Sequence, residues 1–115
     1  MVVISAQDEA MGPRMRPPTG ASAIVLSGFY EGLEVVLDRE RMVIGRGRKA
    51  DLVLAEATIS RAHAIVGFNA EGFYVEDLGS TNGTLVNGSP VGKQHLKNDD
   101  EIQMGRIRIG VSLPE

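Results

Sequence analysis

Three short segments carry polar side chains that folding alone does not require. They are residues 45–49 (Gly-Arg-Gly-Arg-Lys), residues 58–63 (Thr-Ile-Ser-Arg-Ala-His) and residues 79–84 (Gly-Ser-Thr-Asn-Gly-Thr). Each segment directly follows or precedes a short apolar run, and loops held by a rigid sheet are the usual place for binding groups. We therefore expect these segments to be loops that present their side chains to a ligand.

The side chains of these segments suit a phosphate that is attached to a peptide. The guanidinium of Arg46 can form a bidentate, charge-assisted pair with a phosphate, and the hydroxyls of Ser60 and Thr81 offer further donors. Three other basic residues add positive potential: Arg48, Lys49 and Arg61. Asn82 carries both a donor and an acceptor, which is the combination that binds an extended peptide backbone.

Ser60 and His63 also invite a hydrolase interpretation, because a serine nucleophile needs a base aligned on its hydroxyl. If residues 59–63 enter a strand, an odd spacing places the two side chains on opposite faces. The chain has no nucleophile-elbow motif. We therefore expect a non-catalytic protein in which His63 is structural. A metal site or other cofactor is not expected, because His63 and His95 are far apart and lack clustered carboxylates.

Short apolar runs separated by turn residues fill the chain from Ala21 onward. They are rich in Val, Ile, Phe and Tyr, which favour strands, and they cover residues 23–26, 33–37, 42–44, 52–54, 63–68, 72–77, 84–86, 101–104 and 107–111. Asn87-Gly88 is a strong hairpin signal. No window keeps the spacing of an amphipathic helix. About nine or ten short strands with frequent turns predict an all-β sandwich or barrel.

Composition narrows the class of protein. A length of 115 residues with 43% hydrophobic residues fits one globular domain. The net charge of -3 and the aromatic share of 4% argue against general nucleic-acid binding and against base stacking. The absence of cysteine excludes disulfides and fits a reducing compartment. No apolar run is long enough to span a bilayer and no signal peptide is evident, so we predict a cytoplasmic protein without membrane contact.

The first twenty residues differ from the rest of the chain. Residues 11–20 hold three of the five prolines and have no apolar periodicity, so we predict a flexible tail or linker over residues 1–20 and a domain over residues 21–115. Met1–Ile4 has the composition of an extra edge strand, an assignment that we do not adopt. If a kinase phosphorylated Thr19, the tail could occupy the binding groove of its own domain or of a neighbouring copy.

Taken in this order and on this strand pattern, the three polar segments resemble the signature of forkhead-associated (FHA) domains. The resemblance rests on Gly45-Arg46, Ser60-x-x-His63 and Thr81-Asn82-Gly83-Thr84. Supporting matches are Asp51-Leu52, Asp77-Leu78, Asp100-x-Ile102 and Gly105, over about residues 21–113. The resemblance implies a β-sandwich of about eleven short strands, with loops at one end that bind phosphothreonine peptides.

The resemblance also implies a role for each matching residue. Three residues are expected to contact the phosphate: Arg46, Ser60 and Thr81. Arg61 is expected to assist them, and Asn82 to hydrogen-bond the peptide main chain. Supporting roles are implied for Gly45, His63 and Gly83, while Arg48 and Lys49 are auxiliary candidates. Asp99-Asp100 departs from the Gly-Asp that is usual in the family, at a position where we expect a left-handed turn.

The expected partner is a phosphothreonine-containing protein or peptide, either a Ser/Thr kinase or a kinase substrate, bound by a monomeric domain. Family members prefer phosphothreonine to phosphoserine and read the residue three places after it. Two alternatives in other classes stay open besides an enzyme. One is a phosphate-independent interaction scaffold in a secretion or signalling assembly. The other is a nucleic-acid binder that uses Arg46, Arg48 and Lys49, which salt-dependent binding to DNA would reveal.

Overall fold

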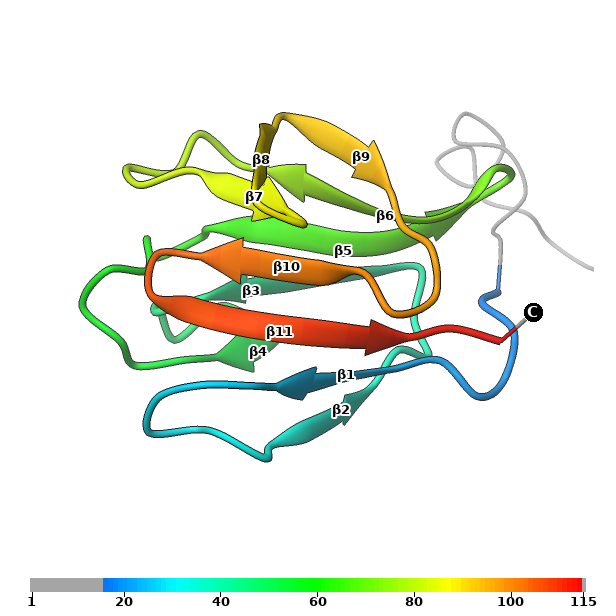
Figure 1. Ribbon diagram of the computed structural model, residues 1–115, viewed down its shortest axis with the longest axis horizontal. Helices are drawn as coiled ribbons and strands as arrows, with labels where there is room; N and C mark the ends of the chain where they lie inside the picture. The colour runs from blue at the N-terminus through cyan, green and yellow to red at the C-terminus, as the bar shows by residue number, and fades with distance from the viewer. Residues whose placement is uncertain (1–15, 115) are drawn as a thin grey trace, which may run out of the picture.

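The computed structural model describes residues 16–114, and these residues form eleven strands in two sheets, with no helix (Figure 1). The six-stranded sheet has the order β2-β1-β11-β10-β7-β8. Its strands are β1 (Ser22–Val25), β2 (Glu34–Val36), β7 (Thr84–Val86), β8 (Ser89–Val91), β10 (Glu101–Met104) and β11 (Ile107–Ser112). The five-stranded sheet has the order β4-β3-β5-β6-β9. Its strands are β3 (Arg41–Gly45), β4 (Leu52–Val53), β5 (Ala64–Asn69), β6 (Gly72–Asp77) and β9 (Lys93–His95).

The predicted all-β sandwich is confirmed, and each apolar run of the sequence overlaps one strand. Two strands have no counterpart among those runs. β8 contains Pro90, which normally disfavours a strand interior, and β9 consists of the polar residues Lys93, Gln94 and His95. Both lie at sheet edges, where a strand needs neither a full ladder of hydrogen bonds nor a buried face. Apolar alternation therefore could not reveal them.

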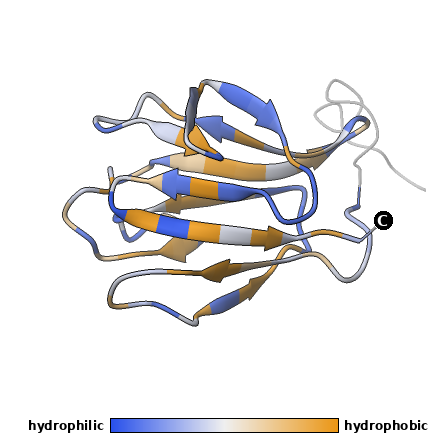
Figure 2. Ribbon diagram, viewed as in Figure 1, coloured by the Kyte–Doolittle hydropathy of each residue, from blue (hydrophilic) through white to orange (hydrophobic). Residues whose placement is uncertain are grey.

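The core lies between the two sheets and is built from alternating side chains. On β11, Ile107, Ile109 and Val111 are buried while Arg108 and Ser112 are exposed. Figure 2 shows this alternation as orange and paler or blue segments along β11. Each fully buried aliphatic side chain contributes about 1.5–3 kcal/mol relative to an exposed one. This packing fixes the sheets, and the sheets fix the loops between strands.

Two turns have the backbone conformations that the sequence predicts. Asn87 and Gly88 have φ values of 50° and 86°, and they join the antiparallel pair β7 and β8 as a two-residue hairpin. Asp99 has a φ of 71°, so the position where this chain departs from the family pattern does adopt the left-handed conformation. Asp100 supports this turn, because its Oδ2 accepts a hydrogen bond of 2.7 Å from the amide of Lys97.

Several loops meet at one end of the sandwich, whereas the first and last described residues lie at the other end (Figure 1). Loops 46–51, 54–63 and 78–83 are at the loop end, and the β1–β2 connection joins them there because the amide of Ala55 donates to the hydroxyl of Tyr30. At the opposite end, a Cβ built on Gly20 would lie 4.0 Å from the Cβ of Pro114. No helix among residues 16–114 has the length and apolarity to cross a membrane.

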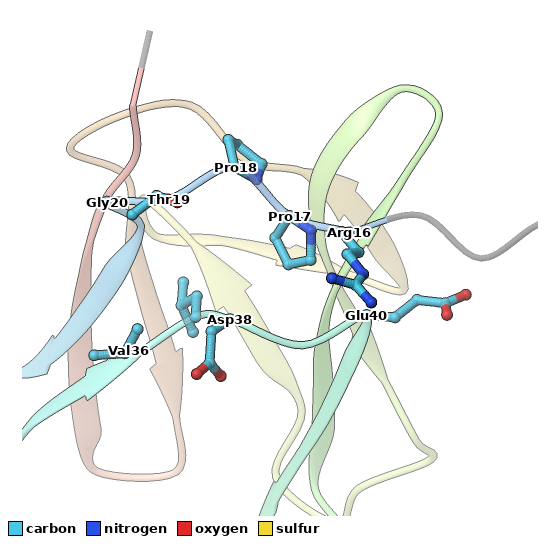
Figure 3. A pocket seen from close by; sticks show the side chains of 9 residues that line it. Arg16, Pro17, Pro18, Thr19, Gly20, Val36, Asp38 and Glu40 are labelled. Carbon is cyan, nitrogen blue, oxygen red and sulfur yellow. The ribbon is translucent and has the colours of Figure 1, made fainter.

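Residues 16–20 lie against the β2–β3 connection. They form one side of a hollow of about 540 Å³, and Val36, Leu37, Asp38 and Glu40 form the other side (Figure 3). Residues 1–15, which make up most of the predicted tail and include Met1–Ile4, lie outside the described residues. The boundary at residue 20 stays a prediction. Thr19 lines this hollow, at the end of the sandwich opposite to loops 46–51 and 54–63. Binding of a phosphorylated Thr19 to its own groove would therefore require this segment to leave the hollow.

Candidate functional site

The end of β3 and the loop before β5 lie side by side. The amide of Arg46 donates to the carbonyl of Ser60 at 3.0 Å, and the amide of Gly47 donates to the carbonyl of Arg61 at 3.0 Å. A Cβ at Gly45 would overlap the carbonyl oxygen of Arg61, so only glycine permits this approach. Two segments that are separate in the sequence thus place Arg46 directly beside Ser60.

The side chain of Arg46 is held by one of its three nitrogens. Its Nε donates to the carbonyl of Ile59 at 3.0 Å. Among residues 16–114, no group forms a hydrogen bond with the two Nη nitrogens, and the residue is exposed. A guanidinium oriented through Nε presents its terminal donors in a fixed plane, which suits an oxyanion arriving from solvent.

Ser60 connects this pair of segments to the third loop. Its Oγ accepts a hydrogen bond of 3.0 Å from the amide of Thr81. The hydroxyl proton of Ser60 remains available for donation, because a hydroxyl can accept and donate at the same time. The residue Thr81 is itself exposed, and no hydrogen bond of its hydroxyl is formed within residues 16–114. Donors from three loops therefore lie around Ser60.

His63 is fully buried and joins the main chains of two loops. The amide of Ser60 donates to Nδ1 of His63 at 3.1 Å, so Nδ1 must be the unprotonated nitrogen. The proton is then on Nε2, which lies 2.8 Å from the carbonyl of Gly83. β5 begins at Ala64, after His63. The side chains of Ser60 and His63 are therefore not placed on opposite faces by strand alternation, which the sequence argument had assumed. Instead, Nδ1 faces the amide of Ser60, and both ring nitrogens bond to main chain.

The side chain of Asn82 also connects the loop of residues 78–83 to the loop of residues 54–63. Its Nδ2 donates to the carbonyl of Thr58 at 2.8 Å, which leaves Oδ1 and one amide proton for a ligand. Thr58 is in turn fixed by the β10–β11 turn, because the amide of Arg106 donates to its Oγ1 at 2.8 Å. A side chain at Gly105 would overlap Thr58. The hydroxyl of Thr58 also donates to Glu56, and this bond is the main cause that holds the pKa of Glu56 below its usual value.

Asp77 organises the third loop from within. Its carboxylate accepts hydrogen bonds from the amides of Gly79 and Ser80 and from the hydroxyls of Ser80 and Thr84. Burial by itself raises the pKa of Asp77, but these hydrogen bonds outweigh it and hold the pKa below its ordinary value of 3.8. The hydroxyl oxygen of Ser80 also accepts a bond from the amide of Gly83, at 2.9 Å. Gly83 has a φ of 82°, which favours glycine.

Sequence reasoning assigned no role to Thr58, Glu56 or Ser80. For Ser80 a local signal existed, since an Asp three residues before a Ser is typical of a turn closed by side chains. For Thr58 there was none, because its partner Arg106 is 48 positions away in the chain.

A basic hollow of about 790 Å³ lies beside this group. Its lining residues are Val43, Arg46, Gly47, Arg48, Lys49, Ala50, Arg61 and Ala62. Ser60, Thr81 and Asn82 do not line it. The structure thus divides the predicted site residues into two groups, the donors around Ser60 and the bases around the hollow, and Arg46 belongs to both.

The fold and the arrangement of these loops agree with a family match. The FHA domain profile matches residues 42–105, which include every residue of the polar loops. The chain belongs to the FHA domain family. This FHA domain is 38% identical over 101 residues to an oxoglutarate dehydrogenase inhibitor of Corynebacterium diphtheriae, covering 87% of this chain and 71% of that protein. It is 39% identical over 93 residues to the glycogen accumulation regulator GarA of Mycobacterium tuberculosis, covering 81% of this chain and 57% of that protein.

Solved structures support the same family assignment. A structure from a study of phosphothreonine-dependent FHA domain interactions has a TM-score of 0.75 and 30% identity, and the match covers 83% of this chain and 97% of that one. FHA-domain relatives of this chain bind phosphothreonine-containing peptides, and the curated relatives are regulators. The family resemblance of the sequence is confirmed.

Proposed function

We propose that this FHA domain binds the phosphate of phosphothreonine with Arg46, Ser60 and Thr81, while Asn82 bonds the peptide main chain and Arg61 assists. The observation that carries the proposal is the position of Ser60. Its hydroxyl is bonded to the amide of Thr81, and its main chain is bonded to that of Arg46. A dianion beside Ser60 can therefore meet donors from three loops at once.

The electrostatics of this end support an anionic ligand. The carboxylate of Asp51 is bonded to Arg39 and to the amide of Val43, and that of Glu56 is bonded to Thr58. Asp51 is thus paired with a base, and the four bases Arg46, Arg48, Lys49 and Arg61 outnumber these two acids. Each charge-assisted bond to the phosphate contributes about 1.5–3 kcal/mol, and the ordering of the peptide offsets much of the sum. We expect micromolar affinity, about -8 kcal/mol.

Replacing Arg46 with alanine tests the assignment. We expect the dissociation constant for a phosphothreonine peptide to rise about a hundredfold, which corresponds to about 2.7 kcal/mol, while the thermal unfolding midpoint stays near that of the natural protein. Isothermal titration calorimetry with phosphorylated and unphosphorylated forms of one peptide measures both effects. The matched control is Arg41→Ala, which removes an exposed arginine at the start of β3, the strand that Arg46 follows. Equal binding by Arg46→Ala would show that the assignment is wrong.

The partner that we propose is a Ser/Thr kinase or a kinase substrate that carries the phosphothreonine. Protein kinases use ATP, so the domain and its partner would meet in the cytoplasm. The relatives named above are an inhibitor and a regulator, and a non-catalytic role fits such names. It also fits His63, whose two ring nitrogens are bonded to main chain instead of to the hydroxyl of Ser60. Equal affinity for the unphosphorylated peptide would favour a phosphate-independent scaffold instead.

A further inference from the structure

We propose that the basic hollow beside Arg46 is a second anion subsite, which binds an acidic or phosphorylated side chain near the phosphothreonine in the same peptide. The inference rests on the proposed function, because the phosphothreonine delivers the second anion to the hollow. The subsite is formed by Arg48 and Lys49 together with Arg46 and Arg61, which also belong to the proposed phosphate site.

The lining of the hollow has one sign of charge. Its side chains are four bases and the apolar residues Val43, Ala50 and Ala62, around Gly47. Arg48, Lys49 and Arg61 are exposed. They come from two loops, which the bond from Gly47 to the carbonyl of Arg61 keeps together. A concentration of bases in a chain with a net charge of -3 is a local field that attracts anions.

The acid nearest to these bases in the sequence is already occupied. Oδ1 of Asp51 lies 3.1 Å from Nη1 of Arg39, and its Oδ2 accepts a bond of 2.8 Å from the amide of Val43. Ion pairs among the described residues involve other basic groups, namely Arg39, His95 and Arg108. Within that part of the chain, the four bases of the hollow therefore have no carboxylate partner. An incoming anion would not have to displace an internal one.

The position of the hollow restricts which part of a peptide reaches it. Arg46 lines the hollow and lies beside Ser60, whereas the loop that carries Thr81 and Asn82 does not line it. Successive residues of an extended peptide advance by about 3.3 Å, and a volume of about 790 Å³ admits a whole side chain. On one side of the phosphothreonine, the bound peptide runs away from the loop of residues 78–83 and toward the hollow. The subsite therefore binds an anionic residue on that side.

The test compares phosphothreonine peptides of one length that differ only in their flanks. The flanks are neutral, acidic on the amino-terminal side, acidic on the carboxy-terminal side, or phosphorylated at a serine on either side. We expect one flank to improve affinity about three- to tenfold, because exposed charge pairs are individually weak. Arg48→Ala/Lys49→Ala should remove this gain, so that this variant binds the neutral and the anionic-flank peptides with equal affinity. A larger gain from phosphoserine would identify a second phosphate as the anion, and an equal gain would identify a carboxylate as sufficient.

The matched control is Arg41→Ala/Lys97→Ala, which removes the same charges from exposed positions outside the hollow and should keep the full gain. Equal affinity of all flanks, or a gain that survives Arg48→Ala/Lys49→Ala, would overturn the subsite. Failure of the proposed function has a different outcome, since the neutral phosphothreonine peptide would then not bind at all.

Discussion

Both ring nitrogens of His63 are bonded to the main chain of the binding loops, one to the amide of Ser60 and one to the carbonyl of Gly83. The neutral ring therefore fixes the distance between two loops that contribute donors to the site. A buried imidazole with two such partners supports the binding geometry without touching the ligand. Its replacement would leave two main-chain groups unpaired in a protein interior, where such groups are costly.

We expect His63→Ala to lower the free energy of unfolding by about 2–4 kcal/mol, from two lost hydrogen bonds and a small cavity. Urea denaturation at neutral pH measures the change. His95→Ala is the control, because the ring of His95 is only half-buried and contacts Asn69 and Glu71 at 3.3 and 3.5 Å. If His63→Ala kept full stability but lost binding, the residue would instead be a ligand contact.

Asp77 makes the third loop sensitive to acid. Its pKa in the folded protein is below the ordinary value of 3.8, so the carboxylate stabilises the fold fully above that value and loses this effect as the pH falls through the folded pKa. We expect Asp77→Asn to be less stable than the natural protein at neutral pH, and the difference to shrink below about pH 4. Denaturation across a pH series measures this. A difference that stays constant down to pH 2 would contradict the prediction.

At the scale of elements, the approach of β3 to the loop before β5 depends on one glycine. Gly45→Ala would force a methyl group into the carbonyl of Arg61 and separate Arg46 from Ser60. We expect a loss of about 2–3 kcal/mol of stability together with weaker peptide binding. The control is Gly92→Ala, where no atom lies within 4 Å of the added carbon and φ is not positive. Equal effects of the two substitutions in thermal denaturation would argue against this role of Gly45.

Whether an element can be predicted from the sequence depends on how far apart in the chain its interacting residues lie. The strands of the core follow from side-chain alternation, as on β11, and the hairpin of Asn87-Gly88 follows from local turn chemistry. The polar loops are visible in the sequence because they interrupt the apolar strand pattern, although Ser60, His63 and Asn82 also form hydrogen bonds within the fold. What joins the loops is not visible, since the bonds of Thr58 to Arg106 and of Ser60 to Thr81 connect distant positions.

At the scale of the whole molecule, ligand binding and folding share the same loops. The bonds that fix Ser60, Thr58 and Asp77 belong to both the fold and the site. A phosphopeptide that binds only the folded state therefore raises the free energy of unfolding, by about 2.7 kcal/mol at a hundredfold excess over the dissociation constant. Calorimetric scans with and without peptide should show this shift, and Arg46→Ala should lack it. A shift produced equally by the unphosphorylated peptide would contradict the prediction.

The meeting of Gly20 and Pro114 at the end remote from Arg46 has a practical consequence. Because the points of entry and exit nearly touch, residues 20–114 can be spliced into a surface turn of a host enzyme or fluorescent protein with little stretching of the host. The proposed phosphopeptide-binding loops would then face outward from the host. The stabilisation of the domain by a phosphorylated target would act on the host through the adjacent strands β1 and β11, which is the geometry that an engineered kinase-activity sensor requires.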